Sequence, residues 1–225
     1  MRRFCFFDLD GTLADTDRDI REAWKAALRD LGLDCPDFDE KFVAGPPIDE
    51  MTRALFPSRY TPELADAVRA GFARHYDGDG FPNTREYPGV IDEARRLKAE
   101  GRVVAVVTNK RFLAATAMAR HFGWDDVFDG VFAGDMLTHP DSRARFVRAG
   151  VAAAAAKLRK PDLLALVMRL YGAAPGECAM VGDTSSDFEA ARANGVFSVG
   201  VAWGYGTEEE LALADVVCRA LPFPL

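Results

Sequence analysis

Blocks of apolar residues alternate with longer stretches of mixed polarity along most of this chain. Five short runs are apolar almost throughout and have the length of buried strands: Phe4–Phe7, Val103–Val107, Val131–Ala133, Cys178–Val181 and Phe197–Val201. Four stretches between them carry apolar residues at helical spacing, namely Ile91–Glu100, Phe112–Phe122, Leu163–Tyr171 and Asp187–Asn194. Strands and helices that alternate in this way form right-handed βαβ units. The pattern therefore predicts an α/β fold with a mostly parallel sheet.

The region from Asp17 to Tyr76 departs from this alternation. Its apolar residues recur at helical spacing, and the clearest series is Ile20, Ala23, Trp24, Ala27, Leu28 and Leu31. Proline and glycine interrupt the helical pattern at Gly45-Pro46-Pro47, and no strand is evident in the region. We therefore predict two domains: an α/β core made of residues 1–14 and 87–225, and an inserted, all-helical domain of residues 15–86.

The composition is that of a globular protein. Of the 225 residues, 49% are hydrophobic and 28% are charged. The 28 basic and 35 acidic side chains give a net charge of −7, which argues against broad binding of nucleic acid. No apolar run approaches the ~20 residues of a membrane span, and no signal-peptide core precedes the first strand. The scattered cysteines form no CxxC pair, so we expect no disulfides and a cytoplasmic protein; they are Cys5, Cys35, Cys178 and Cys218.

Two carboxylates follow the first predicted strand directly. Asp8 and Asp10 are separated by one residue and precede Gly11 and Thr12. In an extended backbone, residues i and i+2 point the same way, so both side chains are expected to converge on one small volume. Two anions held so close repel each other unless a cation or a proton lies between them. The pair therefore indicates a divalent metal site or an acid/base pair.

Three further polar clusters lie at positions that the predicted topology brings near this pair. Thr108-Asn109 ends the second long strand, Gly182-Asp183 ends the strand from Cys178, and Asp187 follows four residues later. The carboxyl ends of parallel strands share one edge of the sheet, where open α/β sheets bind ligands. Lys160, just before a predicted helix, is within reach of the same edge. Carboxylates, a hydroxyl, an amide and an ammonium together suit a magnesium-bound phosphate.

These motifs, in this order, resemble those of the haloacid dehalogenase (HAD) superfamily, and within it the phosphoglycolate-phosphatase-like members. The resemblance covers the whole chain through four motifs: Asp8-Leu9-Asp10-Gly11-Thr12-Leu13, Thr108-Asn109, Lys160-Pro161 and Gly182-Asp183-Thr184-Ser185-Ser186-Asp187. The first and last motifs are specific, whereas the two in the middle gain weight from their order and spacing. The resemblance implies a Rossmann-like core and a helical cap, to which the predicted all-helical domain would correspond.

The resemblance also assigns roles to the four aspartates. Asp8 would be the nucleophile and form an aspartyl-phosphate. Asp10 would protonate the leaving oxygen and then deprotonate the water that hydrolyses the intermediate. Asp8, the backbone carbonyl of Asp10 and Asp183 would bind Mg²⁺, the implied cofactor. Asp187 would orient a metal-bound water or supply a further carboxylate.

The remaining core motifs would bind the phosphoryl group. Thr108 and Lys160 would hold its oxygens, with the lysine neutralising charge in the transition state. Asn109 and the backbone amides after Asp10 would add donors, and Gly11 would allow a close approach of the backbone. The segment from Gly134 to Lys160 is longer than in compact members, so Lys157 competes with Lys160 for the lysine role. Five consecutive alanines within residues 151–157 of this segment predict a helix.

The helical domain would close over the site and contribute contacts to the substrate. Arg18, Arg53 and the loop at Gly45 are the candidates, and an arginine suits a substrate carboxylate. Solvated helix faces explain these arginines equally well. Lys110-Arg111 has two equal explanations as well, since it is consistent with steering phosphate and with a solvated helix start.

We therefore expect a Mg²⁺-dependent phosphatase that acts on a small phosphorylated metabolite, as a monomer or a homodimer. A sugar phosphomutase of the β-phosphoglucomutase type shares Asp8, Asp10 and the cap, and a 5′-nucleotidase-like phosphatase is a further alternative. A non-catalytic phosphate-binding protein is compatible with the fold alone. The retained set of Asp8, Asp10, Lys160 and Asp183 argues against that last alternative.

Overall fold

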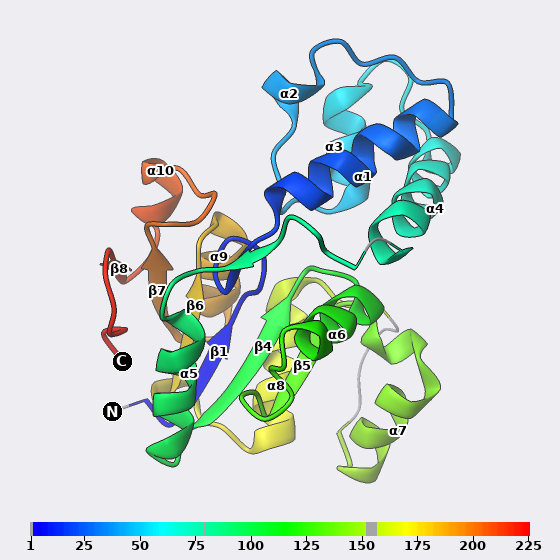
Figure 1. The fold of residues 1–225 in the computed structure, drawn as a ribbon. Coiled ribbons are helices and arrows are strands. Elements are labelled where there is room, and N and C mark those ends of the chain that lie inside the picture. The colour runs from blue at the N-terminus through cyan, green and yellow to red at the C-terminus, as the bar shows by residue number, and fades with distance from the viewer. Residues whose placement is uncertain (1, 79, 152–156) are drawn as a thin grey trace. The chain divides into compact units, whose positions relative to one another are not determined.

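A computed structural model describes residues 2–78, 80–151 and 157–225 of the chain (Figure 1). The chain divides into two compact units, one of Met1–Ala14 with Glu86–Leu225 and one of Asp15–Arg85. The sequence-based expectation was a core of residues 1–14 and 87–225 and a helical domain of residues 15–86. The two boundaries fall within two short strands that pair with each other, β2 (Ala14–Asp15) and β3 (Arg85–Glu86).

The first unit is built on a six-stranded sheet. Its strands are β1 (Phe4–Phe7), β4 (Val103–Thr108), β5 (Gly130–Ala133), β6 (Cys178–Gly182), β7 (Phe197–Val201) and β8 (Val216–Cys218). They lie in the order β5-β4-β1-β6-β7-β8, and every neighbouring pair is parallel. In the register of the central strands, Phe4 lies opposite both Val103 and Cys178. The predicted α/β fold with a parallel sheet is confirmed.

Helices cover both faces of this sheet. In Figure 1, α5 (Val90–Ala99) and α6 (Phe112–His121) lie in front of the strands, and α8 (Lys160–Tyr171) and α9 (Ser185–Ala193) lie behind them. A strand buried on both faces needs apolar side chains pointing both ways, which explains the nearly continuous apolar runs. The remaining elements of this unit are η1 (Met136–Thr138), α7 (Pro140–Arg148), η2 (Pro175–Glu177) and α10 (Glu208–Leu211).

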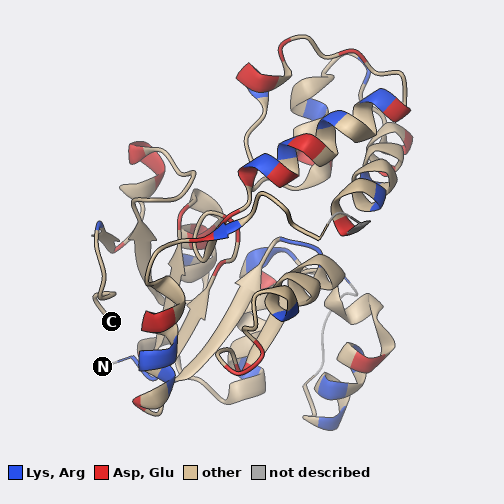
Figure 2. Cartoon of the chain, viewed as in Figure 1, with Lys and Arg blue, Asp and Glu red and all other residues tan. Residues whose placement is uncertain are grey.

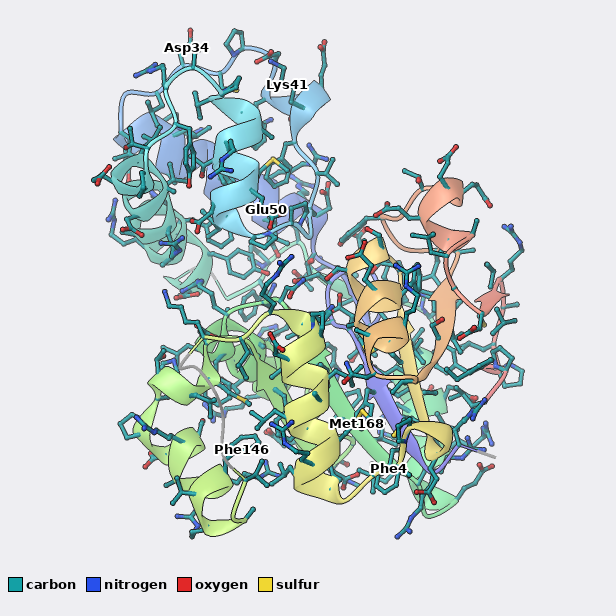
Figure 3. The ribbon with its side chains drawn as sticks, turned by 180° about the vertical axis from the view of Figure 1, so that it is seen from behind. Phe4, Asp34, Lys41, Glu50, Phe146 and Met168 are labelled. Atoms are coloured by element: carbon teal, nitrogen blue, oxygen red, sulfur yellow. The ribbon has the colours of Figure 1, made fainter. Side chains whose placement is uncertain are left out.

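One hydrophobic cluster ties the rear helices to the sheet. Phe6, on β1, is fully buried and packs in this cluster together with Leu163 of α8 and Ala190 of α9. Phe146 of α7 joins the cluster, and Figure 3 shows it on the same side of the sheet as Met168. Because helices on this face are anchored to the central strands, the carboxyl ends of those strands are held in fixed positions.

The second unit consists of four helices: α1 (Asp17–Asp30), α2 (Phe38–Lys41), α3 (Ile48–Leu55) and α4 (Pro62–Gly78). Its residues Asp34, Lys41 and Glu50 are labelled in Figure 3. An aromatic core holds the helices together, in which Trp24 lies 5.5 Å from Phe42 and 6.0 Å from Phe72, measured between ring centroids. All residues from 17 to 76 are described and none lies in a strand, as predicted.

A buried carboxylate fastens α1 to the segment that leaves this unit. Asp19, on α1, is 7% exposed and accepts hydrogen bonds from the backbone N–H groups of Asn83 and Thr84, at 3.1 and 2.8 Å. The amide of Asn83 and the hydroxyl of Thr84 also donate to it, at 2.8 and 2.7 Å. Four donors satisfy the buried charge and fix the chain just before β3.

The segment between β5 and α8 differs from the prediction in its organisation. Pro140–Arg148 forms helix α7, for which the sequence pattern gave no prediction, since its one buried residue is Phe146. The predicted helix at residues 151–157 falls largely on 152–156, which lie outside the described residues. Among the residues that the structure describes, no helix combines the length and apolar character needed to cross a bilayer.

Candidate active site

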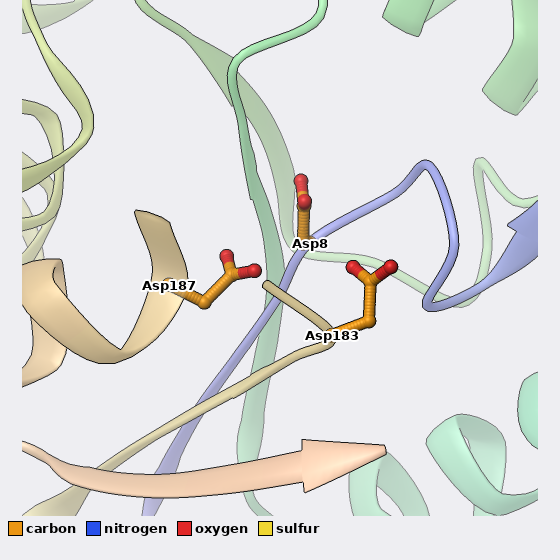
Figure 4. A group of neighbouring side chains, drawn as sticks. All are labelled: Asp8, Asp183 and Asp187. Carbon is orange, nitrogen blue, oxygen red and sulfur yellow. The ribbon is translucent and has the colours of Figure 1, made fainter. Parts of the chain in front are cut away.

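Three carboxylates converge at the carboxyl edge of the sheet. Asp8 follows β1, Asp183 follows β6, and Asp187 lies in the first turn of α9 (Figure 4). One oxygen atom from each lies within 4.8 Å of the others, and all three side chains are buried. Since β1 and β6 are paired neighbours, their ends bring residues 175 positions apart, 8 and 183, to one place.

Asp8 has one oxygen held by the chain and one that no described group satisfies. Its Oδ2 lies 3.0 Å from the ammonium of Lys160, whereas its buried Oδ1 has no hydrogen-bond partner among the described residues. Burial raises the pKa of Asp8 to about 6, while the charge of Lys160 opposes the rise and that of Asp187 adds to it. A buried carboxylate oxygen without a donor is costly, and a cation at this oxygen would remove the cost.

Asp183 is enclosed by donors from two loops. Its Oδ1 accepts a hydrogen bond from the hydroxyl of Thr12 at 3.2 Å, and its Oδ2 accepts one from the backbone N–H of Tyr205 at 2.7 Å. Burial, together with the neighbouring charges of Asp187 and Asp8, raises the pKa of Asp183 to about 8 against the opposing effect of the Tyr205 hydrogen bond. Carboxylates that repel one another in a buried site are the donor set that Mg²⁺ fits.

Three glycines make room for Asp183. A Cβ atom on Gly11 or Gly204 would overlap the Asp183 carboxylate, and one on Gly206 would overlap its backbone carbonyl. Gly11 also has a φ of +75°, which favours glycine. The expectation for Gly11 was a contact with phosphate, and what the structure adds is this steric role. Sequence reasoning missed Gly204 and Gly206, although a Gly-x-Gly after the predicted strand at 197–201 was an available signal.

Lys160 is the lysine of this site. It begins α8, is 3% exposed, and its Nζ lies 2.6 Å from Asp187 Oδ1 in addition to its contact with Asp8. Burial lowers the pKa of Lys160, but the charges of Asp187 and Asp8 raise it by more, so the group stays an ammonium. Lys157, the competing candidate, is exposed.

Asp187 positions this lysine. While its Oδ1 binds the ammonium, its Oδ2 accepts hydrogen bonds from the backbone N–H and the hydroxyl of Thr184, both at 3.2 Å. A Cβ on Gly182 would overlap the Asp187 side chain, so that glycine allows the close approach. With both oxygens engaged by the chain, Asp187 is suited to orienting Lys160.

Asp10 is not one of the three carboxylates whose oxygens cluster. Its charge still raises the pKa of Asp8, but its Oδ1 pairs with the ammonium of Lys110 at 2.7 Å. The alternation of side chains along a strand predicted that both aspartates share one volume. The tight turn after Leu9, closed by a 2.9 Å hydrogen bond from Leu13 N–H to Leu9 carbonyl, ends that alternation. Each aspartate of the pair thus has its own lysine.

Thr108 and Asn109 lie at the end of β4, beside β1. Thr108 is 1% exposed, and its Oγ1 accepts the backbone N–H of Lys110 at 3.1 Å. The side-chain amide of Asn109 donates to Ser186 Oγ at 2.9 Å, which links this loop to the start of α9. Sequence reasoning left Lys110 open between phosphate steering and a solvated helix start. Its side chain is only 5% exposed, which excludes the solvated helix start.

The candidate substrate residues of the helical unit have partners within that unit. Arg18 pairs with Glu22 at 3.0 Å, and the guanidinium of Arg53 lies 4.3 Å from the ring centroid of Tyr60. Gly45 is exposed and has a φ of +118°. Figure 2 shows basic and acidic residues interspersed along α1.

The fold and the site together define an α/β enzyme whose clustered carboxylates and buried lysine lie at the carboxyl edge of a parallel sheet. The model of the haloacid dehalogenase-like hydrolase family matches residues 3–195. The chain belongs to this family. The resemblance found in the motifs and the enzyme class expected from it, a HAD-type phosphatase, are confirmed.

Known proteins similar to this chain agree with this assignment. A probable phosphatase, IndB, of Dickeya dadantii is 30% identical over 220 residues, which cover 96% of this chain and 87% of that protein. A phosphoglycolate phosphatase of Chromobacterium violaceum is 30% identical over 96% of this chain and 91% of its own length. A solved structure of a HAD-like hydrolase from Bacteroides fragilis has the same fold, with a TM-score of 0.81 at 23% identity over 98% of both chains.

Proposed function

We propose that this protein is a Mg²⁺-dependent phosphatase that hydrolyses a small phosphate monoester through an aspartyl-phosphate on Asp8. The observation that carries the proposal is the state of the Asp8 carboxylate. One oxygen is held by Lys160, and the other is buried and without a donor among the described residues. Such a carboxylate is fixed in place and has an oxygen available for a metal ion, which is what a metal-assisted nucleophile requires.

Asp8 and Asp183 are the side chains that would hold Mg²⁺, together with the backbone carbonyl of Asp10. When bound, the ion supplies positive charge that offsets the repulsion of the carboxylates and polarises a phosphoryl oxygen. The hydrogen bonds from Thr12 and Tyr205 hold Asp183 ready in its orientation. The chain's own residues thus supply a preorganised set of oxygen ligands.

The reaction would proceed in two displacements at phosphorus. In the first, a carboxylate oxygen of Asp8 forms a bond to phosphorus, the bond to the ester oxygen breaks, and Asp10 gives a proton to the departing alcohol. In the second, water attacks phosphorus, Asp10 takes a proton from it, and the bond to Asp8 breaks. Phosphate leaves, and both aspartates return to their starting state.

Lys160 and Thr108 would bind the phosphoryl oxygens during both displacements. The ammonium of Lys160 lies 3.0 Å from Asp8 Oδ2, so it would lie next to a phosphorus atom attacked by Asp8. A buried ammonium stabilises the charge of the transition state more than an exposed one would, because the site excludes water. We expect Asn109 to add a donor from the same loop as Thr108.

The helical unit would act as a cap, with Arg18, Arg53 and the loop at Gly45 as its candidate substrate contacts. The relative from Chromobacterium violaceum is named for phosphoglycolate, a small phosphorylated acid. We therefore place the substrate of this chain among small phosphorylated metabolites. A substrate with a carboxylate would suit an arginine of the cap.

Release of inorganic phosphate from a panel of esters tests this function. The panel contains 2-phosphoglycolate, nucleoside monophosphates, sugar phosphates and p-nitrophenyl phosphate, each with Mg²⁺ and with a chelator. We expect release that depends on Mg²⁺, and we expect Asp8→Asn to reduce it by at least about 10³-fold, because the amide is a poor nucleophile. Phosphate retained in a sugar phosphate would instead favour the mutase, and no turnover of any ester would favour a binding protein.

A further inference from the structure

The ion pair of Lys110 and Asp10 has no part in the steps described so far. The ammonium of Lys110 lies 2.7 Å from Asp10 Oδ1, and the two side chains are only 5% and 12% exposed. Burying two charges costs several kcal/mol in desolvation, so a buried pair adds little net stability. Its position is more informative, because the carboxylate that it holds is the proposed acid and base.

The backbone holds both partners of this pair in place. On one side, the N–H of Lys110 donates to Thr108 Oγ1 at 3.1 Å, and the N–H of Phe112 donates to Asp135 Oδ1 at 2.8 Å. The short loop that carries the lysine is therefore fixed at its beginning and at its end. A lysine side chain on a fixed backbone has fewer conformations in which its ion pair is broken.

Asp10 starts from a fixed backbone as well. It forms a bridge with Ala14, and the N–H of Gly11 donates to the carbonyl of Ala14 at 3.0 Å. With the backbone of Asp10 fixed, the orientation of its carboxylate depends on rotation about the side-chain bonds. The ammonium on Oδ1 restricts that rotation.

We propose that Lys110 is a positioning residue for Asp10. Its ammonium holds Oδ1 and thereby fixes the orientation in which the carboxyl group meets the leaving oxygen. A displacement of about 1 Å at a reacting group lowers a rate by roughly 10²-fold. Restricting the rotation of the Asp10 carboxylate should therefore have a measurable effect on the rate. The inference rests on the proposed function, because it concerns the proton transfer of that reaction. It predicts that loss of Lys110 acts on proton transfer more than on binding or on metal-assisted attack.

Esters that differ only in their leaving group separate proton transfer from the other steps. p-Nitrophenolate leaves readily without a proton, whereas the phenolate of phenyl phosphate gains much more from protonation. The two substrates have nearly the same shape and neither leaving group carries an anionic substituent, so Lys110 cannot recognise a charged leaving group. A contact of Lys110 with the phosphoryl group would affect both esters alike. The constant kcat/KM covers the steps up to transfer of the phosphoryl group to Asp8, in which Asp10 acts as the acid.

For Lys110→Met we expect kcat/KM to fall about 10²-fold with phenyl phosphate and by no more than about threefold with p-nitrophenyl phosphate. Lys110→Arg keeps a cation beside Asp10 and is expected to recover part of the loss. The matched control is Lys98→Met, since Lys98 also lies beside an aspartate, 3.2 Å from Asp129 Oδ1, but with 35% of its side chain exposed. We expect the control to leave both constants unchanged.

A double-mutant cycle shows whether Lys110 acts through Asp10. In an Asp10→Asn background, Lys110→Met is expected to change kcat/KM for phenyl phosphate by less than about twofold, because the group that it positions is already lost. Additive losses in the cycle would overturn the proposal. Equal losses with both esters in the single variant would overturn it as well.

The test separates failure of the inference from failure of the proposed function. If the wild type releases no phosphate from any ester of the panel, the proposed function is wrong and the inference falls with it. If the wild type is active and the leaving-group effect is missing, only the inference is wrong. Thermal unfolding of each variant identifies loss of fold, and if Lys110→Met unfolds, Lys110→Gln and Lys110→Arg are compared in both backgrounds instead.

Discussion

At the scale of single residues, the geometry of the site depends on glycines, because they carry no Cβ atom. Asp183 fits between the loops only because Gly11, Gly204 and Gly206 carry no side chain. Its oxygens are then close enough to Thr12 and Tyr205 to accept their hydrogen bonds. The orientation of this proposed metal ligand is therefore set by packing against the backbone, before any ligand binds.

Gly11→Ala tests this packing, with Gly123→Ala as a matched control. Both glycines have a positive φ, +75° and +69°, but a Cβ on Gly123 meets nothing within 4 Å. The control should cost about 1–2 kcal/mol of stability, through backbone strain alone, and keep its activity. Gly11→Ala should cost more in the free energy of unfolding and reduce kcat at least about tenfold, because Asp183 must move. Equal effects of the two substitutions on denaturant unfolding and on kcat would contradict this account.

At the scale of secondary-structure elements, Asp19 joins the two ends of the helical unit's chain. Asp19 connects α1 to residues 83 and 84 at the far end of the unit's sequence by accepting hydrogen bonds from four donor groups. Its carboxylate is buried, so those donors have no access to water as an alternative partner. The two ends of the unit's chain are thereby fixed to each other just after β2 and just before β3.

Asp19→Ala is expected to loosen this closure. The loss of a buried charged acceptor leaves several donors unsatisfied, which should cost about 2–4 kcal/mol of stability. Limited proteolysis should then cut faster near residues 80–86, and the unfolding temperature should fall. Asp66→Ala, which removes an exposed partner of Arg69 on α4, is the control and should change stability by less than about 0.5 kcal/mol. Equal protection of the two variants against protease would show that Asp19 is not the closure.

Element by element, burial decided which parts of the fold the sequence predicted. The strands β1, β4 and β6 are buried on both faces, so their apolar runs are almost uninterrupted. The edge strand β8 has three residues, of which only Cys218 is buried, and it was missed. Helix α7 was missed for the same reason, since Phe146 is its single buried residue. A periodic pattern exists only where a face is buried.

At the scale of the whole molecule, the buried carboxylates of the site lower the stability of the folded state when they are ionised. Burial raises the pKa of Asp183 to about 8 and that of Asp8 to about 6, and repulsion between the carboxylates contributes to both. In an unfolded chain, both carboxyls ionise near pH 4. Between about pH 4 and about pH 8 the folded state therefore binds more protons than the unfolded state. Stability from these groups is thus largest at low pH and is lost as the pH rises through about 6 to 8.

This linkage predicts how pH and Mg²⁺ act together. In a chelator, the unfolding temperature should fall by several degrees from about pH 5.5 to about pH 8.5, because one group contributes up to ~1.4 kcal/mol per pH unit. Mg²⁺ should raise it, and by more at the higher pH, where protons no longer compete for the ligands. Asp183→Asn should remove much of both effects. Thermal unfolding in the two buffers measures them, and an unfolding temperature that rises with pH in the chelator would contradict the prediction.

The residues of the site that the sequence predicted are placed by strand topology. The contacts that it missed depend on turns, side-chain rotation and burial. Asp8 and Asp183 were expected to meet because topology alone brings the ends of neighbouring parallel strands to one edge of the sheet. The pairing of Asp10 with Lys110 was not predicted, because it depends on a turn after Leu9 and on side-chain rotation, which a two-residue period does not describe. The choice of Lys160 over Lys157 likewise required burial, which sequence spacing does not give.

The position of β1 in the sheet has a consequence for synthesis of the chain. It precedes the other five strands in sequence but lies between β4 and β6, whose first residues are 103 and 178. As the nascent chain leaves the ribosome, an almost wholly apolar strand therefore has two unpaired edges until much of the protein has been made. Unpaired apolar strands of this kind promote aggregation. We expect newly made chains to depend on chaperones that shield Phe4–Phe7 until both neighbours arrive.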